Sequence, residues 1–194
     1  MELSKTKQNI LETALQLFNK RGTKIVSTNH IATACSMSPG NLYYHYKNKE
    51  HIITALLEKM IFEWDQQDES EVTISLKEQA ERTFSCVWKY RFLHRELASL
   101  FHRDKAFSLL CSSTLQRRLK EITAVLENME KNCLLKPINT QSKDFLTHTL
   151  LFMALFWIPY LEITGQPDSE SNIKHGSHMM MQLISPYING DNHV

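Results

Sequence analysis

The sequence has little glycine and little proline, five residues of each among 194. Because these residues make most of the tight turns in β-sandwiches and barrels, their scarcity disfavours such folds and favours long helices. No stretch alternates apolar and polar residues for long enough to indicate a strand, whereas apolar residues recur at three- and four-residue spacings along most of the chain. The sequence therefore predicts an all-α fold.

Motifs of catalysis and metal binding are also missing. The chain has four cysteines but no C-x-x-C pair, which excludes the usual zinc-knuckle and thioredoxin-type motifs. His175 and His178 lie three residues apart, but nothing else completes a metal site around them. No nucleophile–base spacing, Gly-rich phosphate loop or paired-carboxylate motif is present either. We predict no enzymatic activity, no metal and no cofactor. The thiols are expected to be small and buried in a reducing cytoplasm; they are Cys35, Cys86, Cys111 and Cys133.

Long hydrophobic runs are scarce, with one exception. Residues 145–161 are uncharged over 17 positions, the short limit for a membrane-spanning helix. The run contains polar residues and Pro159, and no Lys/Arg cluster flanks it. A buried bundle helix explains it better, so no membrane partner is predicted, and a membrane-tethered protein is the less favoured alternative. The first residues lack the apolar run of a secretory signal, and we expect a cytoplasmic location.

Net charge is nearly absent, because 22 Lys and Arg face 21 Asp and Glu for a formal charge of +1. The charge is unevenly distributed, however: residues 1–55 hold seven basic and three acidic residues, or +4, and the remainder carries −3. No acidic residue lies between Glu12 and Glu50. An acid-free basic surface is what attraction to a polyphosphate requires, although a solvated basic face would have the same composition.

Capping residues and apolar spacing divide the chain into expected elements. The first part contains a helix over about 6–20 closed by Gly22, short helices over 28–34 and 39–45, and a helix from Asn48 to about Trp64. An acidic stretch, 65–73, is expected to be a connector. The expected helices after it cover 76–101 with a break near His94, 105–134 capped by Asp104, 142–164, and 169–188.

Residues 28–46 are typical of a helix, a three-residue turn and a second helix that starts at the N-cap Ser38 and Pro39. This is the helix-turn-helix arrangement, whose second helix fits a DNA major groove. Thr28 begins its own helix, where a hydroxyl beside backbone N–H groups can hold a phosphate. The residues expected to face the small core are Ile31, Ala32, Leu42 and Tyr46. The residues expected to point outward, where they can bond bases or phosphates, are Pro39, Asn41, Tyr43, Tyr44 and His45.

This stretch resembles the DNA-binding domain of TetR-family transcriptional repressors. The matching positions, in order, are Ile31-Ala32, Ser38, Gly40, Leu42-Tyr43, Tyr46 and Lys47-Asn48-Lys49-Glu50. The match covers about residues 6–60, and the later helices match only in number and length. The family's turn usually has glycine where this chain has Ser36, before Met37. If that position needs a positive φ, Ser36 lowers the stability slightly.

The resemblance implies a set of DNA-contacting residues. Ser38 and Lys47 belong to this set without a more specific role. The resemblance implies phosphate contacts for Thr28, Tyr44, His45 and Lys49. It implies base or groove contacts for Pro39, Asn41 and Tyr43, with Gly40 allowing close approach of the backbone. It also implies a domain division: residues 1–48 form the helix-turn-helix domain, residues 49–194 form a ligand-binding and dimerisation domain, and the helix 49–64 links the two.

In TetR-like proteins the C-terminal domain binds a small molecule and dimerises through its last two long helices. For the dimer interface, the candidate residues form an apolar row in the last helix, which an intramolecular core would explain equally well; they are Ile173, Gly176, Met180, Leu183 and Tyr187. For the pocket, the candidates are large soft side chains on several helices; they are Phe84, Trp88, Phe92, Phe101, Phe107, Met153, Phe156 and Trp157.

The sequence thus predicts a homodimeric repressor that binds a palindromic double-stranded operator and is released by a small hydrophobic or amphipathic effector. The effector is expected to move the helix 49–64 and so change the separation of two recognition helices, which must span about 34–36 Å or a multiple of it. One alternative is a constitutive DNA-binding regulator with a fully packed C-terminal core. The other is the membrane-tethered regulator that would use residues 145–161.

Overall fold

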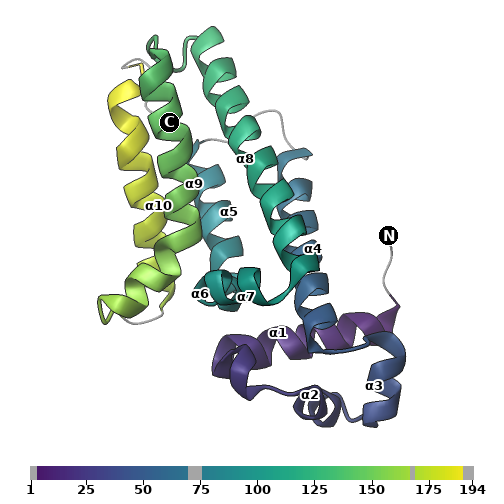
Figure 1. Cartoon of the computed structure of the whole chain (residues 1–194). Helices are drawn as coiled ribbons and strands as arrows, with labels where there is room; N and C mark the ends of the chain where they lie inside the picture. Colours follow the sequence, from purple (N-terminus) through teal and green to yellow (C-terminus); the bar gives the residue numbers. More distant parts are fainter. Residues whose placement is uncertain (1–3, 70–75, 167–168, 190–194) are drawn as a thin grey trace. The chain divides into compact units, whose positions relative to one another are not determined.

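The computed structural model of the chain describes residues 4–69, 76–166 and 169–189, and the named elements within these ranges are helices (Figure 1). The all-α prediction is confirmed. The first elements are α1 (Lys5–Ile25), α2 (Thr28–Ala34), α3 (Pro39–His45) and α4 (Lys49–Glu69). They are followed by α5 (Leu76–Lys89), α6 (Arg91–Arg95), α7 (Leu97–Arg103) and α8 (Lys105–Lys131). The last are α9 (Thr140–Ile163), α10 (Glu170–Ile184) and the 3-10 turn η1 (Ser185–Tyr187).

These helices form two compact units, and the chain passes between them more than once. The head unit comprises the described residues up to 63 together with 90–111. The body unit comprises the described residues of 64–89 and 112–189. This division differs from the predicted boundary at 48/49, because most of α4, all of α6 and α7 and the start of α8 belong to the head unit.

Contacts between α1 and the α6–α7 segment explain why residues 90–111 belong to the head unit. The rings of Phe18 and Phe92 lie 5.2 Å apart between centroids, and both side chains are fully buried. The Phe92 backbone N–H donates to Asn19 Oδ1 at 3.1 Å. The carboxylate of Glu96 accepts from the Thr23 backbone N–H at 2.7 Å and from the Thr23 hydroxyl at 2.5 Å. Residues more than 70 positions apart in sequence thus share one core, which local patterns did not indicate.

The predicted caps are present at the starts of α3, α4 and α8. The Ser38 hydroxyl accepts from the Asn41 N–H at 3.2 Å, with Pro39 in the first helical position of α3. Asn48 Oδ1 accepts from the His51 N–H at 2.8 Å and Asp104 Oδ1 from the Phe107 N–H at 2.7 Å, at the starts of α4 and α8. Gly22 has φ +75°, so the break predicted there is present as a kink within α1.

Some predicted boundaries were wrong. The proposed connector 65–73 is helical as far as Glu69, where α4 ends; residues 70–75 lie outside the described ranges. The 76–101 segment breaks at Tyr90 and at Glu96, and His94 is buried within α6. α8 ends at Lys131, because Cys133 takes φ +57° and closes the helix. There, the N–H groups of Cys133 and Leu134 donate to the Glu130 and Met129 carbonyls, the pattern of a Schellman motif.

The cysteines only partly follow the expectation of buried thiols. Cys86 and Cys111 are buried, and burial raises the pKa of the Cys111 thiol. Cys35 is half-buried and Cys133 is exposed, so the expectation was wrong for Cys133. The reason is the helix end itself, since a residue that reverses the chain after the last turn lies on the surface.

The core of the body unit forms where α10 packs against α5 and α9. Phe84 and Trp157 meet edge to face, with centroids 5.8 Å apart, beside Gly176. The Trp157 indole N–H donates to the Asn172 carbonyl at 3.0 Å, which fixes the ring on α10. By length and composition, α9 is apolar enough to cross a membrane, and 44% of its most apolar window is buried within the protein.

Candidate nucleic-acid interface

The helix-turn-helix is built by a tight turn between α2 and α3. Ser36 has φ +53°, and the N–H groups of Ser36 and Met37 donate to the Thr33 and Ala32 carbonyls at 3.0 Å. This is a Schellman ending, for which glycine is favoured because a Cβ is strained at positive φ. The turn position therefore has the positive φ at which Ser36, unlike glycine, lowers the stability slightly. Ile31, Ala32, Leu42 and Tyr46 are all buried, as predicted.

With that side buried, α3 presents polar and aromatic side chains to solvent. Pro39, Gly40 and Asn41 are exposed, Tyr43 is 48% exposed and Tyr44 is 84% exposed, whereas His45 is half-buried. A seven-residue helix with this outward face matches the requirement for insertion into a major groove.

Two of the predicted DNA contacts already touch each other. The Thr28 hydroxyl and the Tyr43 hydroxyl lie 2.9 Å apart and share a hydrogen bond from α2 to α3. This bond orients the Tyr43 ring on the outward face before any partner binds.

α2 begins with a capping box that sequence reasoning missed: Ser27 Oγ accepts from the His30 N–H, and His30 Nδ1 accepts from the Ser27 N–H, both at 3.2 Å. The Ser-x-x-His spacing was the available sign, with histidine in the usual place of Glu or Gln.

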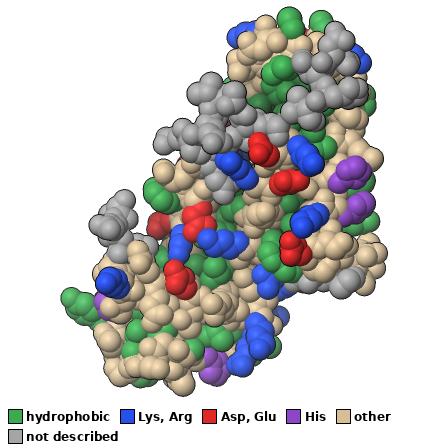
Figure 2. Space-filling view, turned by 180° about the vertical axis from the view of Figure 1, so that it is seen from behind, with side chains coloured by type: hydrophobic (Ala, Val, Ile, Leu, Met, Phe, Trp, Pro, Cys, Tyr) green, Lys and Arg blue, Asp and Glu red, His purple; other side chains and the backbone are tan. Residues whose placement is uncertain are grey.

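Two other side chains that were predicted to contact DNA form hydrogen bonds within the chain. The Ser38 hydroxyl caps α3, and the Lys49 ammonium donates to the Thr23 carbonyl at 2.6 Å beside the kink in α1. Lys47 is exposed. The core Tyr46 lies against Lys7, and burial, with Glu58 nearby, raises the pKa of its hydroxyl to about 12, so it stays neutral. Figure 2 shows basic (blue) and His (purple) side chains at its lower right, on the head unit.

The body unit contains a cavity of about 580 Å³, within the range of small-molecule sites. It is bounded by the end of α4 and by α5, α8, α9 and α10, and most of the side chains that line it are aliphatic. The polar, charged and aromatic members of its lining are Trp64, Gln79, Arg82, Thr83, Arg118 and Glu121.

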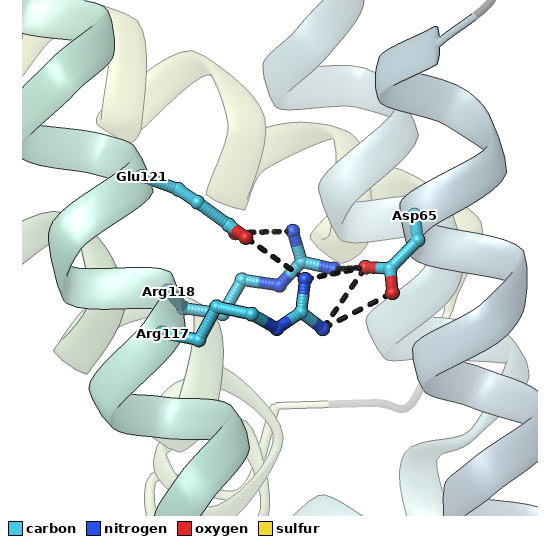
Figure 3. A network of polar contacts seen from close by, with 4 residues as sticks. All are labelled: Asp65, Arg117, Arg118 and Glu121. Carbon is cyan, nitrogen blue, oxygen red and sulfur yellow. Dashed lines mark hydrogen bonds and ion pairs between the residues drawn. The ribbon is translucent and has the colours of Figure 1, made fainter.

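At this cavity, two carboxylates and two guanidinium groups join α4 to α8 (Figure 3). Asp65 accepts from Arg117 at 3.1 Å and also pairs with Arg118. Glu121 accepts from Arg117 at 2.8 Å and from Arg118 at 2.7 Å. These hydrogen bonds, first of all those to Asp65, raise the pKa of the Arg117 guanidinium. The Arg118 guanidinium also lies 4.8 Å from the centre of the Trp64 ring, a cation–π contact.

Comparisons with known proteins agree with this architecture. The family model described as "Bacterial regulatory proteins, tetR family" matches residues 10–56, and the one described as "Bacterial transcriptional repressor" matches residues 58–193. The chain belongs to the TetR family. Its members are DNA-binding transcriptional regulators without enzymatic activity, and they typically form dimers.

Individual transcriptional regulators resemble the chain, two of them over most of its length and one over about a third. A TetR-family regulator from Marinobacter aquaeolei VT8 is 28% identical, with a TM-score of 0.85 over 96% of this chain and 93% of that one. The probable HTH-type transcriptional regulator YttP of Bacillus subtilis is 25% identical over 94% of this chain and 86% of its own length. The HTH-type transcriptional regulator QacR of Staphylococcus aureus is 38% identical over 61 residues, which make up 31% of this chain and 32% of that protein.

The large side chains that were predicted to line the pocket of this TetR-family protein lie away from the cavity. None of the eight lines the 580 Å³ cavity. Phe92 and Phe107 are buried in the head unit, and Phe101 is exposed there. Phe84 and Trp157 are buried against Gly176, Trp88 and Met153 are half-buried at the body core, and Phe156 is exposed. Large rings mark where helices pack, whereas the cavity lies where smaller aliphatic side chains leave space.

The predicted dimer row on α10 faces the inside of its own chain. Ile173, Gly176 and Met180 are buried within the body unit, and Leu183 and Tyr187 pack against the same core. The apolar spacing correctly identified a buried face, but the surface that covers it is α5 and α9 of the same chain. His175 and His178 lie on the exposed side of α10, and among the described residues no three potential metal ligands come together.

Proposed function

We propose that this TetR-family protein is a homodimeric repressor that reads a palindromic operator with α3 and leaves it when a small amphipathic effector fills the body cavity. The observation that carries the DNA-binding part is the outward face of α3, where Asn41 and Tyr43 are exposed on a helix held by a tight turn. The earlier DNA-contacting set is proposed unchanged, with phosphate contacts from Thr28, Tyr44, His45 and Lys49, and with Lys47 as a further member of the set. Ser38 and Lys49 act first in positioning α3 and α4.

A binding experiment tests the role of α3. A DNA duplex is selected from a random pool with the wild-type protein, and mobility shifts are then measured for Asn41→Ala and for Tyr43→Ala. Each variant is expected to bind the selected duplex about 5- to 150-fold more weakly, since one base contact contributes about 1–3 kcal/mol. Gln116→Ala, an exposed position on α8, is the matched control. Equal affinities for all four proteins would refute the assignment of α3.

The effector part of the proposal rests on the cavity and on α4. Trp64 of α4 lines the cavity, whereas the same helix up to Glu63 belongs to the head unit. A ligand in the cavity therefore contacts a helix that continues without a break into the DNA-binding unit. If no amphipathic compound changes the melting temperature or operator release, the protein is a constitutive regulator instead.

The dimer part rests on a row of large exposed side chains on α9. Five side chains of this row are between 41% and 86% exposed: Phe145, Phe152, Phe156, Tyr160 and Ile163. The rings of Phe152 and Phe156 contact each other in a tilted arrangement, with centroids 4.9 Å apart. Such a row on a long helix is typical of a protein interface. A symmetric dimer also suits a palindromic operator, because two recognition helices must meet successive major grooves.

We further propose that the protein is cytoplasmic. Full recovery in the soluble fraction without detergent would support this location, and recovery in membranes would refute it.

A further inference from the structure

We infer that the effector is an aliphatic anion, such as a medium-chain carboxylate, whose head group competes with Asp65 for Arg118. This inference rests on the proposed effector-responsive function and adds the chemical class of the ligand and the contact that it breaks. Three observations carry it: the aliphatic wall of the cavity, the charges in its lining, and the adjacency of Trp64 and Asp65 on α4.

The wall of the cavity suits a hydrocarbon chain. Leucine, isoleucine, valine, methionine and alanine from α5, α8, α9 and α10 make up most of it. Among the described lining residues Trp64 is the single aromatic one, and the Arg118 guanidinium already lies over its ring. Quaternary ammonium ligands are typically recognised by aromatic cages, which these residues do not supply. An aliphatic body therefore fits better than an aromatic or cationic one.

The charges in the lining favour a negative head group. Arg82 and Arg118 line the cavity, and Glu121 is the acidic residue that lines it with them. The Arg118 side chain is 7% exposed, so its charge lies in a poorly solvated place, where an added anion is stabilised more strongly than at the surface. An added cation would instead meet two buried or half-buried positive charges. Arginine also binds a carboxylate through two parallel hydrogen bonds, which gives directional recognition.

The existing ion pairs determine what the new anion would displace. Arg118 is shared between Asp65 of α4 and Glu121 of its own helix (Figure 3). Glu121 lies three residues from Arg118 on the same helix, α8, whereas Asp65 belongs to α4; each of the two carboxylates has Arg117 as its other partner. A ligand carboxylate on Arg118 therefore replaces Asp65 more readily than Glu121.

Displacement of Asp65 would alter the position of α4. Trp64 and Asp65 are consecutive, and both hold the end of α4 to Arg118, one through its ring and the other through its carboxylate. A ligand that takes over Arg118 loosens both contacts at once. Because the preceding residues of α4 belong to the head unit, the change reaches the DNA-binding helices through a continuous helix. The anion thus acts as an inducer that exchanges an internal ion pair for an external one.

Three ten-carbon probes that differ in charge test the ligand class. Decanoate, decanol and decyltrimethylammonium are titrated into the full-length protein by calorimetry, below their micelle concentrations, and operator release is measured in parallel. We expect decanoate to bind about tenfold or more tightly than decanol, the ammonium to bind most weakly, and decanoate to release the operator. Equal binding of decanoate and decanol, or a preference for the ammonium, would overturn the inference while leaving an effector-responsive repressor. If none of the three binds or releases the operator, the proposed effector function itself fails.

Variants test the exchange of partners. Arg118→Met is expected to keep decanol binding and lose the preference for decanoate, and Arg118→Lys, which keeps the charge, should retain part of it. Lys120→Met is the matched control, because Lys120 is an exposed cation of the same helix that does not line the cavity, and the preference should persist. Asp65→Asn should bind decanoate severalfold more tightly than the wild type, since the competing carboxylate is gone, and should bind the operator more weakly without ligand. If Asp65→Asn binds decanoate no better than the wild type, the exchange is refuted. Circular dichroism shows whether Arg118→Met folds; if it does not, the decanoate preference of Arg118→Lys tests the role of Arg118 in its place.

Discussion

Replacing Gly176 by alanine is expected to destabilise the protein by about 2 kcal/mol, although alanine is the better helix former. A Cβ at this position of α10 would lie 2.3 Å from Phe84 Cε1 and 2.8 Å from Trp157 Cε2. Both rings are buried, so neither can move away into solvent. Overpacking of a core costs about 1–3 kcal/mol, and the shortness of these distances places Gly176→Ala near the upper end. The gain in helix propensity returns about 1 kcal/mol.

Urea unfolding followed by circular dichroism measures the change, at a fixed protomer concentration because dimerisation would otherwise shift the midpoint. The melting temperature should fall by about 4–8 °C for 2 kcal/mol in a chain of this size. Gly40→Ala in α3 is the matched control, since the nearest atom to its Cβ is the Ser38 hydroxyl at 4.0 Å, and no loss is expected.

A double variant identifies the cause of the loss. Replacing the neighbouring Phe84 ring by the smaller leucine side chain makes room for the new methyl group. Gly176→Ala should therefore lower the free energy of unfolding less in the Phe84→Leu background than in the wild type. Strict additivity of the two changes would show that the methyl group does not meet Phe84. A Gly176→Ala protein as stable as the wild type would refute the packing argument as a whole.

Three further changes test other parts of the molecule. Glu96→Ala removes the acceptor of two hydrogen bonds from Thr23 and should destabilise the head unit by about 2–3 kcal/mol, measured by urea unfolding; an unchanged midpoint would contradict the shared core. The hydrogen bond from Lys143, with that from the Ile138 N–H, lowers the pKa of the Glu130 carboxyl, so its stabilisation is present at neutral pH and is lost as the pH falls through that lowered value. Glu130→Gln should therefore be less stable than the wild type at neutral pH, with a difference that shrinks in acid; a constant difference would argue against it. Phe152→Glu should shift the protein from dimer to monomer in sedimentation, whereas an unchanged dimer would exclude this face of α9.

Local chemistry made much of the head unit predictable. Ser38 and Pro39 determine where α3 begins, Asn48 caps α4, and the apolar positions that include Leu42 and Tyr46 determine which side of the helix-turn-helix is buried. These features depend on residues within a few positions of one another. The outward face of α3 then follows, because what is not buried on a short helix is exposed.

The cavity and the interior of the body unit were less predictable, because they depend on which faces of distant helices meet. Gly176 shows this, since its spacing marks a buried face of α10 but not whether α5 or a second chain covers it. Arg118 shows it as well: the sequence places an arginine in a long helix, whereas its pairing with Asp65, more than 50 positions earlier, arises only when α4 and α8 are side by side. The large aromatic residues identified regions where helices pack closely, whereas the cavity that can hold a ligand lies among smaller side chains.

The return of residues 90–111 to the head unit has a consequence for how TetR-family regulators can be recombined. A chimaera that joins the first 48 or 63 residues of one member to the remainder of another keeps the recognition helix of the first but receives α6 and α7 from the second. Phe18 would then face a foreign residue in place of Phe92, and Thr23 a foreign residue in place of Glu96. Exchange of operator preference between two regulators should therefore succeed when the segment 90–111 travels with the N-terminal helices, so the portable part of this protein is discontinuous in sequence.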